Sequence, residues 1–188
     1  VKFTTLSGNG DIGTWSSEYI MADPGGGDPD ITFPNDPRIY VMDQGTYANR
    51  VYIVWTGSAG NVSDGTESCS WCAYADAPYT SWTTSFIDRN TGMSLYNIKR
   101  VNYLLTLGSG NTLLYIYEHL DYSDIEAGTM VGVDTRAFRS TNGGSSWIDD
   151  GEITPGDGNY YFFPNGATSR DLSNNRDVAW NYFYWRTP

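Results

Sequence analysis

Apolar and polar residues alternate with a period of two in short runs along the chain, which is the pattern of β-strands buried on one face. Glycine, asparagine, aspartate and serine gather between these runs, where turns are expected. Two neighbouring pairs of runs, within 38–55 and 95–118, predict β-hairpins. The runs that predict strands are 1–6, 38–42, 50–55, 68–74, 95–107, 112–118, 132–140, 147–153, 159–163 and 178–185. The sequence therefore predicts an all-β protein that forms a single domain over residues 1–188.

The segment 139–147 lies between two of these runs and predicts a tight hairpin turn. Its serine hydroxyl groups can bond the loop's own amides, and Trp147 then re-enters the core as a large apolar side chain. Positive φ angles, which such a turn needs, are expected at Asn142, Gly143 and Gly144.

The turn residues follow the order Ser140-x-Asn142-x-Gly144-x-Ser146-Trp147. This order resembles the Asp-box, or BNR repeat, of sialidase-like β-propellers, whose pattern is Ser-x-Asp-x-Gly-x-Thr-Trp. Asn142 replaces the Asp, and Ser146 replaces the Thr. In that family the box folds a hairpin and is normally not catalytic, so the resemblance implies an architecture and carries over no catalytic residue.

Two less complete copies of the box occur earlier in the chain. The segment 76–82 keeps Ser81 and Trp82 but has lost the glycine. In the other copy, the residues that match the types of the box are Ser7, Asn9, Gly13, Thr14 and Trp15, but their spacing is one residue too long. The three tryptophans Trp15, Trp82 and Trp147 are 67 and 65 residues apart.

The predicted elements repeat in the order strand, strand, strand, box, strand, which is the content of one propeller blade. The chain starts and stops inside a unit, so its two ends can complete one blade together. Three blade equivalents are fewer than the four that closed propellers typically need. Either the chain is a fragment, or identical chains share a ring. The alternative fold is a two-sheet β-sandwich or jelly roll.

The chain carries a formal net charge of −11 and has only two lysines, Lys2 and Lys99. This leaves no basic surface for nucleic acid and argues against adhesion to anionic lipid. No apolar run approaches the roughly 20 residues that span a bilayer. The start at Val1 without Met fits a processed mature chain or an excised piece of a longer one. Because the sequon Asn61-Val-Ser63 lies in a Gly/Ser-rich loop, we expect an extracellular or cell-surface protein, glycosylated at Asn61.

Cys69 and Cys72 are the only cysteines. In a strand their side chains point to opposite faces, about 10 Å apart, which is too far for a disulfide. With one histidine and no further cysteine, the chain offers no second half for a structural zinc site. We expect buried or locally bridged structural cysteines.

Catalytic signatures are weak. His119 is the only histidine, and no nucleophile elbow accompanies it. Tyr117 and Glu118 are residue types that sialidases use, but they point to opposite faces of a regular strand. The Arg-Ile-Pro segment of sialidases is absent. The sequence therefore favours a protein without enzymatic activity.

Aromatic residues at Trp180, Tyr182 and Tyr184 share one face of a predicted strand and can form a platform for a sugar ring. Trp71 belongs to a second aromatic cluster, and the alternative for any single ring is cross-strand packing in the core. Acidic loops can bind calcium, with Asp23, Asp28 and Asp30 as candidates, although a solvated acidic surface is the simpler interpretation. No other cofactor is expected.

Three functions remain open at this point. The first is a non-catalytic, secreted or cell-surface binding module for carbohydrate. The second is a self-assembling structural subunit of a filament or sheath, in which unpaired strands of one copy complete the sheet of the next. The third is a fragment of a sialidase-like glycoside hydrolase.

Overall fold

The structure is a computed structural model that describes residues 2–3, 19–20, 32–58, 68–89, 96–107, 111–124, 129–154, 160–168 and 178–185. All regular secondary structure in these ranges is β-strand, which confirms the all-β class. The strands are β1 (Lys2–Phe3), β2 (Tyr19–Ile20), β3 (Thr32–Val41), β4 (Val51–Ser58), β5 (Ser68–Ala75), β6 (Thr83–Arg89), β7 (Tyr96–Leu107), β8 (Thr112–Asp124), β9 (Thr129–Ser140), β10 (Ile148–Glu152), β11 (Tyr160–Thr168) and β12 (Val178–Trp185).

The first sheet has four antiparallel strands in the order β3-β4-β5-β6, so each strand lies beside its neighbour in sequence. Its register places Ile39 opposite Ile53 and Trp55 opposite Trp71. The hairpin predicted over 38–55 is confirmed by the pairing of β3 with β4.

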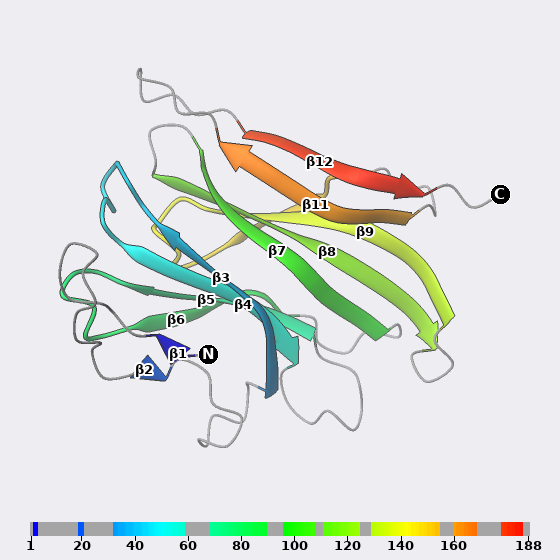
Figure 1. Cartoon of the computed structure of the whole chain (residues 1–188), viewed down its shortest axis with the longest axis horizontal. Coiled ribbons are helices and arrows are strands. Elements are labelled where there is room, and N and C mark those ends of the chain that lie inside the picture. Colours follow the sequence, from blue (N-terminus) through cyan, green and yellow to red (C-terminus); the bar gives the residue numbers. More distant parts are fainter. Residues whose placement is uncertain are drawn as a thin grey trace, which may run out of the picture.

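The second sheet repeats this arrangement, because β7, β8, β9 and β10 also pair antiparallel with their sequence neighbours. The run 95–107 forms strand β7, and its predicted hairpin with the next run is confirmed. The hairpin β11-β12 joins this sheet through a parallel pairing of Tyr160 with Val133 and packs against β7, β8 and β9. Figure 1 shows β11 and β12 beside these three strands.

Both sheets contain three strands, a seven-residue turn that ends in tryptophan, and a fourth strand. The turns are 76–82, ending at Trp82, and 141–147, ending at Trp147. Both units thus show the predicted order of elements, although no strand was predicted over 83–89, where β6 lies. Trp15, the third tryptophan of the series, lies outside the described residues. The described strands stack as open sheets, and a closed ring of blades stays a prediction.

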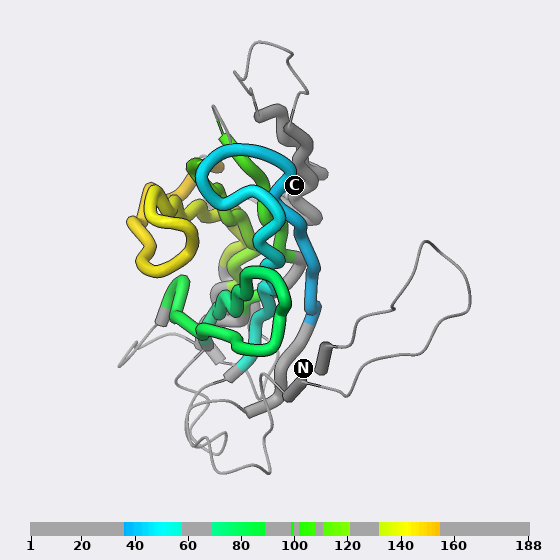
Figure 2. Tube along the Cα trace, turned by 90° about the vertical axis from the view of Figure 1, so that its left-hand side faces the viewer, coloured from blue at the N-terminus to red at the C-terminus, as the bar shows by residue number. Residues whose placement is uncertain are grey.

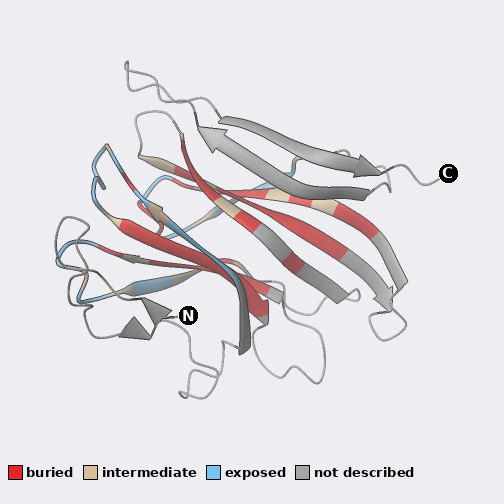
Figure 3. Ribbon diagram, in the orientation of Figure 1, coloured by how far each residue is buried: buried red, intermediate tan, exposed pale blue. Residues whose placement is uncertain are grey.

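The main hydrophobic core lies between the two sheets and receives side chains from both. Tyr115 and Tyr117 of β8 occupy its centre, and Trp147 packs on Tyr115 with the ring centroids 6.3 Å apart. Its buried residues are Met42, Tyr52, Val54, Cys72, Ile87, Leu104, Leu113, Tyr115, Tyr117 and Phe138. Figure 3 shows buried residues running through the middle of both sheets.

A second cluster lies on the opposite face of the first sheet and consists of Ile53, Trp55, Cys69, Trp71 and Ala73. The first sheet is therefore apolar and buried on both faces, in contrast to a sheet with one solvated face. Cys69 and Cys72 belong to different clusters, both are buried, and neither is in a disulfide, which confirms that they are not bridged to each other.

Candidate functional site

Three turns meet at one end of the two sheets. They are 42–50 between β3 and β4, 76–82 between β5 and β6, and 141–147 between β9 and β10. Figure 2 looks at this end of the molecule and shows the three turns in cyan, green and yellow. Polar and aromatic side chains from all three turns contact one another here, so the site joins the first sheet to the second.

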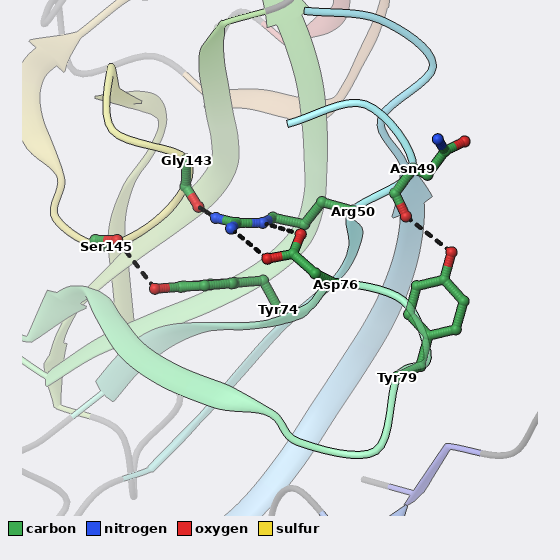
Figure 4. A network of polar contacts seen from close by, with 7 residues as sticks. All are labelled: Asn49, Arg50, Tyr74, Asp76, Tyr79, Gly143 and Ser145. Carbon is green, nitrogen blue, oxygen red and sulfur yellow. Dashed lines mark hydrogen bonds and ion pairs between the residues drawn. The ribbon is translucent and has the colours of Figure 1, made fainter. Parts of the chain in front are cut away.

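Arg50 is at the centre of this contact (Figure 4). Its Nε and Nη2 atoms donate to the two carboxylate oxygens of Asp76 at 2.8 and 2.7 Å, and Nη1 donates to the carbonyl oxygen of Gly143 at 3.0 Å. The guanidinium lies 4.5 Å from the ring centroids of both Tyr47 and Tyr74. Planar, bidentate and stacked contacts of this kind need arginine and are not reproduced by lysine.

The tip of the turn 141–147 fits closely into the first sheet. A Cβ atom at Gly143 would lie 2.7 Å from the Tyr47 ring, and one at Gly144 would lie 3.2 Å from the Tyr52 ring. Ser85 of β6 donates a hydrogen bond to the Gly144 carbonyl oxygen at 2.7 Å. The two glycines are buried and have φ angles of 68° and 89°, so both space and backbone conformation require glycine.

The turn 141–147 is closed by its own side chains. The Ser140 hydroxyl accepts from the Gly144 amide at 2.9 Å and donates to Asn142 Oδ1 at 3.0 Å, and Oδ1 also accepts from the Ser146 amide at 3.0 Å. Asn142 Nδ2 donates to the Ser146 hydroxyl at 2.7 Å. One expectation is corrected: Asn142 is not among the residues with positive φ, because its side chain bonds the turn while the two glycines make the bend.

An open depression with a volume of about 300 Å³ lies at the β5–β6 turn. It offers one tyrosine, one carboxylate and three aliphatic hydroxyl groups. The lining residues are Tyr74, Ala75, Asp76, Ala77, Pro78, Thr80, Ser81 and Thr83. The turn is held in place by a hydrogen bond from the Tyr79 hydroxyl to the Asn49 carbonyl oxygen at 2.9 Å, drawn in Figure 4.

The electrostatics of the depression are set by the Arg50–Asp76 pair. The hydrogen bonds from Arg50 lower the pKa of Asp76, and the same bonds raise the pKa of Arg50. Asp76 is therefore a carboxylate at neutral pH and accepts hydrogen bonds only. Its side chain is 60% exposed, so it can still contact a ligand.

A second polar cluster is buried between the sheets, further along the same strands. Lys99 Nζ forms an ion pair with Asp88 Oδ2 at 2.5 Å, and the Tyr117 hydroxyl donates to the same oxygen at 2.7 Å. Burial lowers the pKa of Lys99 and raises that of Tyr117. Burial, with the nearby charges of Lys99 and Arg136, lowers the pKa of His119 to about 4, so its imidazole is neutral at pH 7.

The structure tests only one of the aromatic residues predicted to bind sugar. Trp71 is only 1% exposed and stacks on Trp55 with ring centroids 6.0 Å apart. It is a core residue, which corrects its assignment to a binding platform. Trp180, Tyr182 and Tyr184 lie on strand β12 as expected, and their side chains are outside the described residues.

The structure assigns no role to the remaining predicted residues. Asp23, Asp28, Asp30 and Asn61 lie outside the described residues. In the part of the chain that the structure describes, no group of three or more His, Cys, Asp or Glu side chains is placed to hold a metal ion. Glu118 is fully buried.

The sequence placed Tyr74 in an aromatic cluster with Trp71 and Tyr79, but it did not predict Asp76 or the contacts that bring these side chains together. The bonded pairs are separated by 26 residues for Arg50 with Asp76 and by 71 for Tyr74 with Ser145. The one available signal is their position beside predicted turns, because residues that flank turns at the same end of a sheet come together.

Comparison with protein-family models and with curated proteins finds no match for this chain. The resemblance to the Asp-box therefore rests on the turn residues themselves. Within the described ranges, no helix is long and apolar enough to cross a membrane.

Proposed function

We propose that this chain is a non-catalytic, extracellular binding module and that it binds carbohydrate in the depression at the β5–β6 turn. The observation that carries the proposal is the lining of that depression, which combines the Tyr74 ring, the Asp76 carboxylate and the hydroxyl groups of Thr80, Ser81 and Thr83. A sugar presents hydroxyl groups beside apolar ring faces, and these groups match such a lining.

The fixed carboxylate favours a neutral or amino sugar over an acidic one. Asp76 accepts hydrogen bonds from sugar hydroxyls, and its position is set by two hydrogen bonds from Arg50. The whole chain has a net charge of −11, which repels acidic glycans at low salt.

The lining argues for binding without hydrolysis. A glycosidase commonly places two carboxyl groups on either side of the bond that it cleaves. Asp76 is the only carboxyl group among the eight residues that line the depression, and Glu118 is buried elsewhere. A sialidase-like hydrolase fragment is therefore the weaker proposal.

A matched pair of variants tests the binding site. Thr83→Arg adds bulk and charge inside the depression, whereas Thr84→Arg adds the same group to the next, equally exposed residue, which is not part of the lining. We expect an array of neutral, amino-sugar and acidic glycans to give a neutral or amino-sugar ligand. Binding should fall at least about tenfold, or by 1.4 kcal/mol, in Thr83→Arg only. Equal loss in both variants, or no glycan bound by the wild type, would contradict the proposal.

The exposed edge of the first sheet supports a second candidate function, a self-assembling structural subunit. Strand β3 ends the strand order of that sheet, and its Ile39 and Val41 side chains are 61% and 53% exposed. Apolar edge strands favour strand addition by another copy. Light scattering of the wild type and of Ile39→Lys tests it: concentration-dependent assembly that the lysine abolishes supports a subunit, and a monomer at all concentrations contradicts it.

The propeller is the architecture that we propose for the complete ring. Two successive four-stranded units with the same order, followed by the β11-β12 hairpin packed on the second unit, support a stack of blade-like layers. A second copy of the chain, or further chain, is needed to close such a ring. Small-angle scattering that gives a disc with an axial hole supports the ring, and a flat two-layer envelope supports a sandwich.

A further inference from the structure

The ion pair between Lys99 and Asp88 joins the two sheets inside the molecule. Asp88 lies on β6 of the first sheet and Lys99 on β7 of the second. The Lys99 side chain is fully buried and that of Asp88 is 10% exposed, with Nζ and Oδ2 2.5 Å apart. The amine nitrogen and the carboxyl oxygen are thus in direct contact, too close for a water molecule to lie between them.

Burial changes the chemical state of such a pair. An isolated charge is costly in an apolar interior, and transfer of one proton from the ammonium to the carboxylate gives a neutral amine and a neutral acid. The lowered pKa of Lys99, caused first by burial, agrees with this direction. A neutral lysine amine is a nucleophile, and its contact with Oδ2 keeps it beside the carboxyl group whose carbon it would attack, so that the reaction is intramolecular.

The neighbouring groups are placed to assist attack on Asp88. The Tyr117 hydroxyl donates to Asp88 Oδ2, which is the oxygen that becomes negative when an amine adds to the carboxyl carbon. His119 is paired with Lys99 in the register of β7 and β8 and is neutral at pH 7, so its imidazole can accept a proton.

We propose that Lys99 and Asp88 become joined by an amide bond between Nζ and Cγ. The neutral amine adds to Cγ of the protonated carboxyl group, and Tyr117 stabilises the charge on Oδ2. The Nζ–Cγ bond forms, the Cγ–Oδ1 bond breaks, and Oδ1 leaves as water with one proton from the acid and one from the amine. His119 carries the amine proton to the leaving oxygen. No oxidant, metal or further reactant is needed, and no group changes its oxidation state.

The bond has a structural consequence that is independent of the proposed glycan site. It ties the fourth strand of the first sheet to the first strand of the second sheet, next to Tyr117 in their shared core. A covalent cross-link restricts the unfolded chain and so stabilises the folded one. Such a tie suits a protein that works outside the cell with no disulfide between its two described cysteines.

Peptide mapping of the wild-type protein tests the bond directly. Trypsin cleaves after Arg89, which lies between the two residues, so an unlinked chain gives Asp88 and Lys99 in separate linear peptides. Trypsin does not cleave after an acylated lysine, so the linked chain gives one branched peptide that joins 51–89 to 90–100. This peptide is lighter than the two segments 51–89 and 90–100 together by one water. The mass of the intact protein is not sufficient evidence, because cyclisation of the aspartate in Asp64-Gly65 or Asp157-Gly158 also loses one water. Such a cyclisation does not join two peptides, so the branched peptide distinguishes the two reactions.

Two variants identify the chemistry. Lys99→Met removes the nucleophile and should abolish the branched peptide. Tyr117→Phe keeps the ring and removes the hydroxyl, and it should slow bond formation roughly a hundredfold. The rise of the branched peptide is followed after folding is started from chain that was recovered unfolded and unlinked from insoluble expression, because denaturant does not break an amide bond. If wild-type protein incubated after folding yields only the two linear peptides at their full masses, the contact is an ion pair and the proposal is overturned. That result does not depend on the folding of any variant.

Discussion

The turns 76–82 and 141–147 occupy the same place in their two sheets, yet they are held by different means. The later turn is closed by hydrogen bonds among its own Ser140, Asn142 and Ser146. The earlier turn lacks these side chains and is held from outside, by Arg50 on Asp76 and by the Tyr79 hydroxyl on Asn49. The later turn is thus closed by its own side chains, and Arg50 and Ser85 also bond its carbonyl groups. The earlier turn has a backbone bond from the Tyr79 amide to the Asp76 carbonyl oxygen, and its side chains bond to neighbouring segments.

This difference explains what each turn does in the molecule. The self-closed turn presents two buried glycines as a tip that fits against Tyr47 of the turn 42–50 and Tyr52 of β4. The externally held turn leaves an open depression beside it. A repeated element has thus become a docking tip in one unit and a candidate ligand site in the other.

The largest effect is expected from filling the docking contact. Gly143→Ala should lower the free energy of unfolding by roughly 2–4 kcal/mol, because the new methyl group meets the Tyr47 ring and the residue must keep a positive φ. Gly151→Ala is the matched control, since Gly151 also has a positive φ but no atom within 4 Å of its added methyl group. We expect a loss of about 1 kcal/mol there. Equal losses in urea unfolding would show that docking contributes nothing.

A smaller effect should follow from opening the self-closed turn. Ser140→Ala leaves the buried Gly144 amide without its acceptor, which should cost about 1–3 kcal/mol. In the earlier turn Ser81 is exposed, and Ser81→Ala should change stability by less than about 0.5 kcal/mol. Denaturant unfolding of both variants gives the comparison. A loss of 1 kcal/mol or more at Ser81 would mean that the two turns are held alike.

Local sequence patterns predicted the features that depend on neighbouring residues. Near-continuous apolar runs located strands such as β4 and β8, and the spacing of Cys69 and Cys72 placed them on opposite faces. The serine and asparagine of the turn 141–147 bond within the loop, as their types indicate. Each of these features is decided within a few residues of the chain.

Features decided by distant contacts escaped the sequence. The burial of Trp71 depends on what covers the second face of its sheet, and period-two alternation does not reveal a sheet with two apolar faces. The role of Arg50 depends on partners that are 26 and 93 residues away. The positive φ of Tyr79 was also missed, because a tyrosine gives no signal for that conformation.

The smallest of the three expected effects is a difference between the two turns in how acid changes the free energy of unfolding that each contributes. The pKa of Asp76 is lowered in the folded protein from 3.8, so its contribution is present at neutral pH and is lost as the pH falls below that value. The carboxylate is mostly exposed, so Asp76→Asn should cost under about 1 kcal/mol at pH 7. The stabilities of the two proteins should converge as the pH falls below 3.8 and through the lowered pKa of Asp76. Protonation of His119 acts at higher pH, between about 4 and 6.5, and is common to both proteins, so it cancels in the difference between their stabilities.

The cost of Ser140→Ala should not change over the acid range, because no ionisable side chain bonds Ser140, Asn142 or Ser146 in the closed turn. Unfolding curves measured from pH 7 to 2 test both expectations. A cost of Asp76→Asn that stays constant with pH would show that the Arg50–Asp76 ion pair does not stabilise the earlier turn.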